Sequence, residues 1–142
     1  MVVHRGTSGL KDMATDLYYA LGGNVKNTNR FKHAQKVQKE AEKKYGVDST
    51  TTLGHSLGGK IASSVGQDSK QIITYNKAVN PYDAFKKTSS KEINIRTSLD
   101  PVSVLLPKNK NTITIKSKSS NPLIEHSTNA LGRLDKNKVI GK

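Results

Sequence analysis

Residues 50–59 read Thr50-Thr51-Thr52-Leu53-Gly54-His55-Ser56-Leu57-Gly58-Gly59, and this stretch decides the fold. The β-branched residues at its start favour a strand, and the apolar residues of the following segment, Ile61 to Val65, are spaced as in a helix. The serine between them is flanked by glycines, which is the layout of a nucleophile elbow. In so sharp a strand-to-helix turn, a side chain at Gly54 or Gly58 would clash. The stretch therefore predicts an α/β fold in which Ser56 is a candidate nucleophile.

The same turn supplies a candidate oxyanion donor. It places the backbone N–H of Leu57 in the first turn of the following helix, where the positive end of the helix dipole stabilises developing negative charge. His55 and Gly59 complete the predicted elbow, and we expect the His55 side chain to point away from Ser56.

A serine hydroxyl needs an imidazole as base, and the imidazole needs a carboxylate to fix its tautomer. His126 is the only histidine after the elbow, and we expect it in a loop-like stretch before a short helical segment. Asp100 follows the alternating strand Ile93 to Thr97, so it is placed at the carboxyl end of a strand. Asp68 reads instead as a residue at a helix end, and Asp83 as part of an amphipathic segment. The chain order Ser56, Asp100, His126 is that of an α/β-hydrolase.

With these residues, the chain resembles the class 3 lipase family of α/β-hydrolases, in an unusually short form. The segment Val2-Val3-His4-Arg5-Gly6-Thr7 looks like the family's strand ending in Arg-Gly-Thr or Arg-Gly-Ser, and residues 54–59 match its elbow. Asp100-Pro101-Val102 matches its aspartate block, and His126 falls at its histidine loop. The resemblance implies a triad of Ser56, His126 and Asp100 that hydrolyses a lipid or other acyl ester through an acyl-enzyme. It assigns the oxyanion hole to Thr7 and Leu57, and it implies no metal and no cofactor. Lys60 stands where the family has a small or apolar residue.

We expect one domain over residues 1–142, a small, mainly parallel sheet flanked by helices. The proposed strands are Val2–His4, Thr50–Leu53, Gln71–Asn76, Glu92–Thr97 and Thr112–Lys116. Helices are predicted from the apolar stripe of residues 10–21 and from Asn29 to Tyr45. Only 33% of the residues are hydrophobic, which predicts a lean core and modest stability, with a sheet edge that is uncovered or paired with a second chain.

The net charge of +13 raises the question of a partner. Nucleic acid is the less favoured one, because only four of the 24 basic residues are arginine and no stacking aromatics or nucleic-acid motif accompany them. A diffuse positive surface favours peripheral contact with an anionic membrane surface, or needs no partner at all. The oligomeric state is left open. No apolar leader or membrane span is predicted, and an intracellular or virion location is compatible with the sequence. Two alternatives remain, a catalytically inactive hydrolase-fold interaction protein and a basic nucleic-acid-binding protein.

Overall fold

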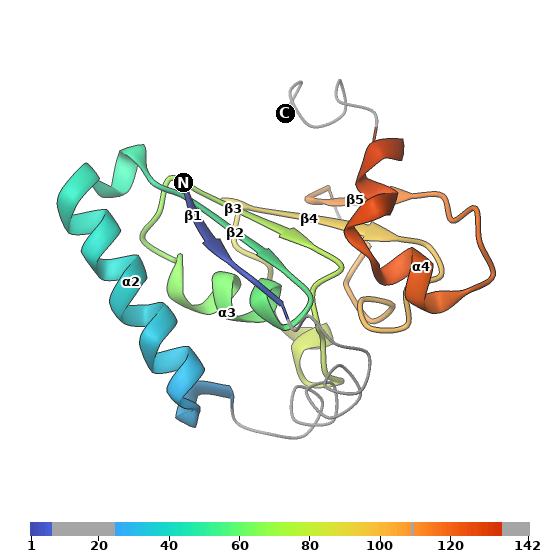
Figure 1. Cartoon of the computed structure of the whole chain (residues 1–142), viewed down its shortest axis with the longest axis horizontal. Coiled ribbons are helices and arrows are strands. Elements are labelled where there is room, and N and C mark those ends of the chain that lie inside the picture. Colours follow the sequence, from blue (N-terminus) through green and yellow to red (C-terminus); the bar gives the residue numbers. More distant parts are fainter. Residues whose placement is uncertain (7–24, 109, 135–142) are drawn as a thin grey trace.

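The protein, described by a computed structural model at residues 1–6, 25–108 and 110–134, is built on a five-stranded, all-parallel sheet (Figure 1). Each strand pairs with the next in the chain, in the order β1-β2-β3-β4-β5. The strands are β1 Val2–His4, β2 Thr51–His55, β3 Gln71–Tyr75, β4 Glu92–Thr97 and β5 Thr112–Ile115. The α-helices are α2 Asn29–Tyr45, α3 Leu57–Val65 and α4 Pro122–His126, and short 3₁₀ helices occupy Val25–Asn27, Val47–Ser49, Asp83–Phe85 and Thr128–Arg133. The predicted small α/β sheet flanked by helices is therefore confirmed.

All five predicted strands are present, and the helix predicted from Asn29 to Tyr45 has these bounds. Its ends are set locally. The Thr28 side chain accepts a hydrogen bond from the Phe31 N–H at its start, and Gly46 ends it with φ of 85°. The helix after the elbow begins at Leu57, so the Leu57 N–H lies in its first turn, as predicted. The predicted helical stripe at residues 10–21 lies outside the described residues.

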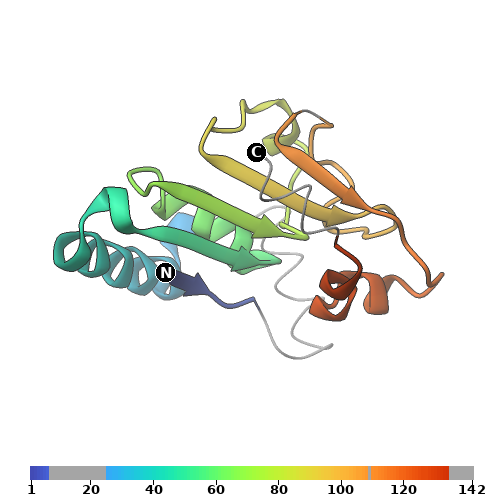
Figure 2. The same ribbon diagram turned by 90° about the horizontal axis from the view of Figure 1, so that it is seen from above.

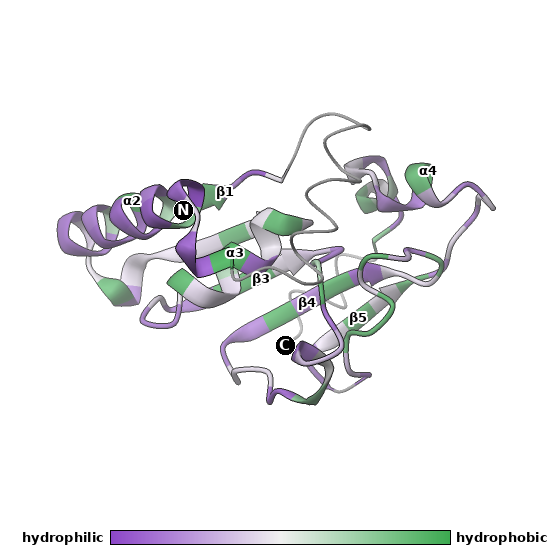
Figure 3. Cartoon of the chain, turned by 90° about the horizontal axis from the view of Figure 1, so that it is seen from below, coloured by the Kyte–Doolittle hydropathy of each residue, from purple (hydrophilic) through white to green (hydrophobic). Residues whose placement is uncertain are grey.

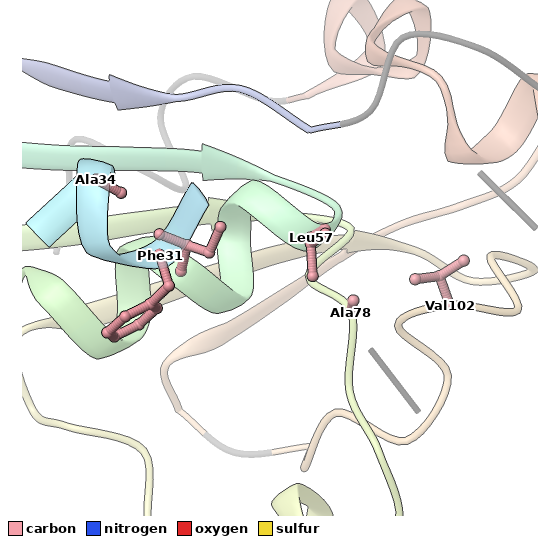
Figure 4. Close-up of a cluster of buried hydrophobic side chains, with 6 residues drawn as sticks. Phe31, Ala34, Leu57, Ala78 and Val102 are labelled. Carbon is pink, nitrogen blue, oxygen red and sulfur yellow. The ribbon is translucent and has the colours of Figure 1, made fainter. Parts of the chain in front are cut away.

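Helices α2 and α3 both lie against one face of the sheet (Figure 2). The apolar core on that face is small and consists of Phe31, Ala34, Leu57, Ile61, Ala78 and Val102 (Figure 4). On the opposite face Tyr75, Ile95, Ile113 and Ile115 pack against Ala130 of the last 3₁₀ helix. The hydrophobic core is thus divided between two thin layers, as the lean composition predicts.

Polar residues fill the remaining space on the α2 and α3 face. The buried Thr52 hydroxyl is 2.8 Å from Ser69 Oγ, and Thr74 Oγ1 donates to Asn94 Oδ1 at 2.6 Å. These bonds replace part of the hydration that the buried groups lose on folding, although the Asn94 side-chain nitrogen has no hydrogen-bond partner.

Candidate active site

Ser56 occupies the sharp turn between β2 and α3. Its φ of 56° and ψ of −125° lie in a region that non-glycine residues rarely adopt, and it is the N-cap residue of α3. Backbone hydrogen bonds hold this conformation. The Ser56 N–H donates to Tyr75 O at 3.0 Å, and the Ser56 carbonyl accepts from the Ala78 N–H at 3.1 Å. The turn has the strained strand-to-helix geometry of a nucleophile elbow.

Glycines make this turn possible by allowing backbones to touch. A Cβ atom on Gly54 would lie 2.2 Å from the carbonyl oxygen of Gly58. A Cβ atom on Gly58 would lie 2.1 Å from the carbonyl oxygen of His4. Real Cβ atoms do not approach backbone oxygens so closely, so the predicted requirement for glycine at both positions is confirmed. At Gly59 the constraint is weaker, since the nearest atom would be Lys77 Cα at 3.2 Å.

A continuous chain of hydrogen bonds runs from an acid through an imidazole to Ser56. His126 Nδ1 lies 2.7 Å from Asp100 Oδ1, and His126 Nε2 lies 2.9 Å from Ser56 Oγ. The three residues are buried, with exposed fractions of 1% for Asp100, 2% for His126 and 8% for Ser56. A carboxylate only accepts hydrogen bonds, so Nδ1 carries the proton and Nε2 is free to accept the serine proton. The arrangement can activate a serine hydroxyl by general-base catalysis.

Asp100 is fixed by the turn that follows β4. Its Oδ2 accepts hydrogen bonds from the Ser103 N–H at 2.9 Å and from the Ser103 hydroxyl, and its Oδ1 accepts from the Val102 N–H at 3.4 Å. These donors hold the carboxylate in one orientation and compensate its charge. They leave Asp100 Oδ1 directed at His126 Nδ1.

His126 is the last residue of the short helix α4, so the prediction of a loop-like stretch at residues 122–126 is wrong. The physical reason is local. The Asn121 side chain accepts a hydrogen bond from the Leu123 N–H, and Pro122 supplies the fixed φ of a first helical turn. A single helical turn can therefore form in a segment without apolar periodicity.

The His55 side chain contacts His126 rather than Ser56. Its Nε2 lies 2.8 Å from the carbonyl oxygen of His126, so this nitrogen carries the proton and donates. Its ring lies between those of His126 and Tyr75, with centroid distances of 4.9 and 5.5 Å. Burial lowers the pKa of His55 and outweighs the opposing hydrogen bond to the His126 carbonyl. The imidazole is therefore neutral at neutral pH. The sequence did not reveal this contact, because it depends on residues 71 positions apart.

Of the two predicted oxyanion donors, the structure describes one. Leu57 is the first residue of α3, where a backbone N–H has no acceptor within the helix. Thr7 lies outside the described residues.

Tyr75 and Asn76, at the end of β3, are contacts that the sequence did not predict. The Tyr75 hydroxyl donates to the Ser127 carbonyl at 2.9 Å, immediately after His126. Burial, with a smaller effect from the charge of Asp100, raises the pKa of Tyr75 to about 12, so the hydroxyl keeps its proton. Asn76 was predicted as the last residue of its strand, but β3 ends at Tyr75, so no feature of the sequence pointed to this contact.

A cavity of about 630 Å³ lies on the α3 side of the sheet, and none of Ser56, Asp100 and His126 lines it. Lys60 and Asp83 are among its lining residues, and Lys60 Nζ is 2.8 Å from Asp83 Oδ2. Lys60 is thus held in an ion pair and its side chain is only 16% exposed, so it does not extend freely into solvent. Asp68, by contrast, is exposed after the end of α3.

Within residues 1–6, 25–108 and 110–134, no group of three or more His, Cys, Asp or Glu side chains is placed to hold a metal ion. In the same part of the chain, none of the helices has the length and apolar character needed to cross a membrane.

Comparisons of this chain with protein-family models, with curated proteins and with solved structures find no match. The chemistry of the site therefore rests on the geometry of its own residues.

Proposed function

We propose that the protein is a serine hydrolase of class 3 lipase type that cleaves carboxylic esters of a lipid or another acyl group. One observation carries this proposal, the unbroken hydrogen-bond chain from Asp100 through His126 to a serine in a strained elbow. Catalytic triads are recognised by these nucleophile–base and base–acid hydrogen bonds rather than by sequence position. The resemblance of residues 54–59 and 100–102 to lipase motifs supports the same class.

In the proposed reaction, His126 Nε2 takes the Ser56 proton as Oγ attacks the ester carbonyl carbon. The negative charge that forms on the carbonyl oxygen is stabilised by the Leu57 N–H at the start of α3. The His126 imidazolium, stabilised by Asp100, then gives its proton to the leaving alcohol, which leaves Ser56 acylated. Water, deprotonated by the same imidazole, attacks the acyl carbonyl carbon, and the imidazolium returns the proton to Ser56 Oγ as the carboxylic acid leaves. His126 Nε2 thus carries every proton that is transferred in the two steps.

Exposed apolar side chains near the sheet's carboxyl edge support a lipid substrate. Seven large apolar residues are exposed in the segments that follow β3, β4 and β5, namely Tyr82, Phe85, Leu99, Val104, Leu105, Leu123 and Ile124. Figure 3 shows apolar residues beside hydrophilic ones in α4, and a run of apolar residues in the loop between β4 and β5. Apolar side chains exposed to this extent are compatible with contact to a lipid surface, and the net charge of +13 favours anionic lipid over neutral lipid. We therefore propose peripheral contact with an anionic membrane surface.

The test is labelling of the purified protein by a fluorophosphonate probe, with turnover of p-nitrophenyl butyrate measured in parallel. Labelling should be confined to Ser56 and should disappear in Ser56→Ala and His126→Ala. Ser64→Ala is the matched control. Ser64 is a serine of α3, the helix that follows Ser56, and its hydroxyl donates to the Lys60 carbonyl. It should label and turn over substrate like the wild type.

Two results would contradict the proposal. The absence of labelling in a folded sample would favour an inactive hydrolase-fold interaction protein. Salt-sensitive binding of DNA or RNA that Ser56→Ala leaves intact, without esterase activity, would favour a nucleic-acid-binding protein. The lipid preference fails separately if anionic and neutral vesicles are hydrolysed equally at low salt.

A further inference from the structure

Asn76 is a fully buried amide at the end of β3, with an exposed fraction of 0%. Its φ of 43° is left-handed, and among the described non-glycine residues only Ser56 shares this sign. Asparagine adopts this region more readily than most residues, but the conformation still costs free energy. A strained, buried polar residue beside a candidate active site calls for a physical explanation.

The Asn76 side chain joins the acid-bearing strand to the base-bearing helix. Its Oδ1 accepts a hydrogen bond from the Thr97 N–H at 2.9 Å, at the end of the strand that leads to Asp100. Its Nδ2 donates to the carbonyl oxygens of Glu125 at 2.9 Å and His126 at 3.2 Å. One planar amide thus bonds to both segments that carry the partners of Ser56.

Residues beside Asn76 hold the third of the three segments, the turn that carries Ser56. The Tyr75 carbonyl and the Ala78 N–H hold the backbone of Ser56, as described above. The segment from Tyr75 to Ala78 therefore contacts the nucleophile, the acid strand and the base helix together. The position of His126 relative to Ser56 and Asp100 therefore depends on residues 75–78.

Only an amide side chain has the required set of donors and an acceptor. It offers one oxygen to an N–H and two N–H groups to two carbonyls, and these bonds use its full donor capacity. Aspartate would keep the acceptor but place a second oxygen against two carbonyl oxygens. Glycine would keep the left-handed backbone but remove all of the side-chain bonds.

We infer that Asn76 is the positioning residue of this site, which sets the His126 imidazole between Asp100 and Ser56 through the backbone of α4. This inference rests on the proposed function for its consequence in catalysis. Its structural content, that Asn76 sets the hydrogen bond between His126 and Asp100, can be measured without substrate.

The experiment compares Asn76→Gly and Asn76→Asp with Asn94→Ala. Asn94 is the matched control, since it is an equally buried asparagine, itself in β4, whose side-chain oxygen accepts a hydrogen bond from Thr74 in β3 and whose side chain makes no hydrogen bond to α4. A displacement of about 1 Å at a catalytic group costs about 10²-fold in rate. Both Asn76 variants should lower kcat for p-nitrophenyl butyrate by about this factor with little change in KM, because the bond matters in the transition state. Asn94→Ala should lose thermal stability but keep its kcat.

The readout without substrate is the downfield proton NMR resonance of His126 Nδ1–H. It should be present in the wild type and in Asn94→Ala, and shifted or lost in both Asn76 variants. If the wild type has no esterase activity, the proposed function fails, and the resonance still decides the role of Asn76. An unchanged resonance and kcat in folded Asn76→Gly would overturn the inference. Failure of both Asn76 variants to fold, when Asn94→Ala folds, would also overturn it, because the residue would then serve the fold as a whole.

Discussion

Replacing Asp100 by asparagine tests the proposed chemistry most directly, because the structure dictates how the new amide must lie. Asp100 Oδ2 accepts from the backbone N–H and the hydroxyl of Ser103, while Oδ1 faces His126 Nδ1. A backbone N–H can only donate, so the amide oxygen of the variant must take the Oδ2 position. The amide NH₂ then faces His126 Nδ1. That nitrogen must accept, and the imidazole proton moves to Nε2, which faces Ser56 Oγ.

In this tautomer His126 cannot take the serine proton. We expect Asp100→Asn to lower kcat by about 10⁴-fold, the loss that the same change of tautomer causes in serine-protease triads. That factor corresponds to about 5.4 kcal/mol of transition-state stabilisation, at about 1.36 kcal/mol per decade. The assay is turnover of p-nitrophenyl butyrate, and ¹⁵N NMR of the histidine rings would report the tautomer. The variant should stay folded, because both bonds from Ser103 are kept, the bond to His126 is kept with donor and acceptor exchanged, and only the 3.4 Å bond from the Val102 N–H is lost.

Asp83→Asn is the matched control, since Asp83 pairs with Lys60 and Lys86 and not with His126. It should leave turnover unchanged. A folded Asp100→Asn variant with a loss below about tenfold would refute the reasoning, as would a His126 proton that stays on Nδ1. Either result would mean that the tautomer does not depend on this carboxylate.

Two further predictions concern the fold. Gly54→Ala should destabilise the protein by about 3 kcal/mol or more in urea unfolding, because its Cβ would lie 2.2 Å from the carbonyl oxygen of Gly58. Gly132→Ala, where a Cβ would meet no atom within 4 Å, should instead stabilise it by about 0.4–1 kcal/mol, and equal effects at both positions would contradict the predicted clash. Hydrogen bonds from Arg133, and from two backbone N–H groups, lower the pKa of Glu125 from 4.5 to about 2, although burial opposes this shift. The stability from this depressed pKa is present above pH 4.5 and is lost as the pH falls toward 2, so the urea midpoint should fall over this range by more in the wild type than in Glu125→Gln.

Much of the fold could be predicted from local sequence. The bounds of α2 follow from its apolar spacing, the cap at Thr28 and the glycine at Gly46, all of which act over a few residues. The strands were found because β-branched runs alternate with turn residues. The elbow was predictable for the same reason, since two glycines and a serine within five residues define one backbone turn.

The candidate site was only partly predictable. Ser56, Asp100 and His126 could be named from residue type, chain order and their places after predicted elements, but their contact joins segments 26 to 70 positions apart. Whether an imidazole nitrogen lies 2.9 Å or 9 Å from a hydroxyl depends on how the segments pack. No local pattern contains that distance.

By itself, therefore, the sequence determined where strands and helices form, the strained serine turn and the residue types available for chemistry, because each depends on neighbours in the chain. Tertiary structure alone decided that His55 donates to the carbonyl of His126, that Lys60 pairs with Asp83, and that Asn76 joins the acid strand to the base helix. Hydrogen bonds act only over about 3 Å and demand aligned donors and acceptors. Such contacts exist only once the sheet has brought the carboxyl ends of its strands together.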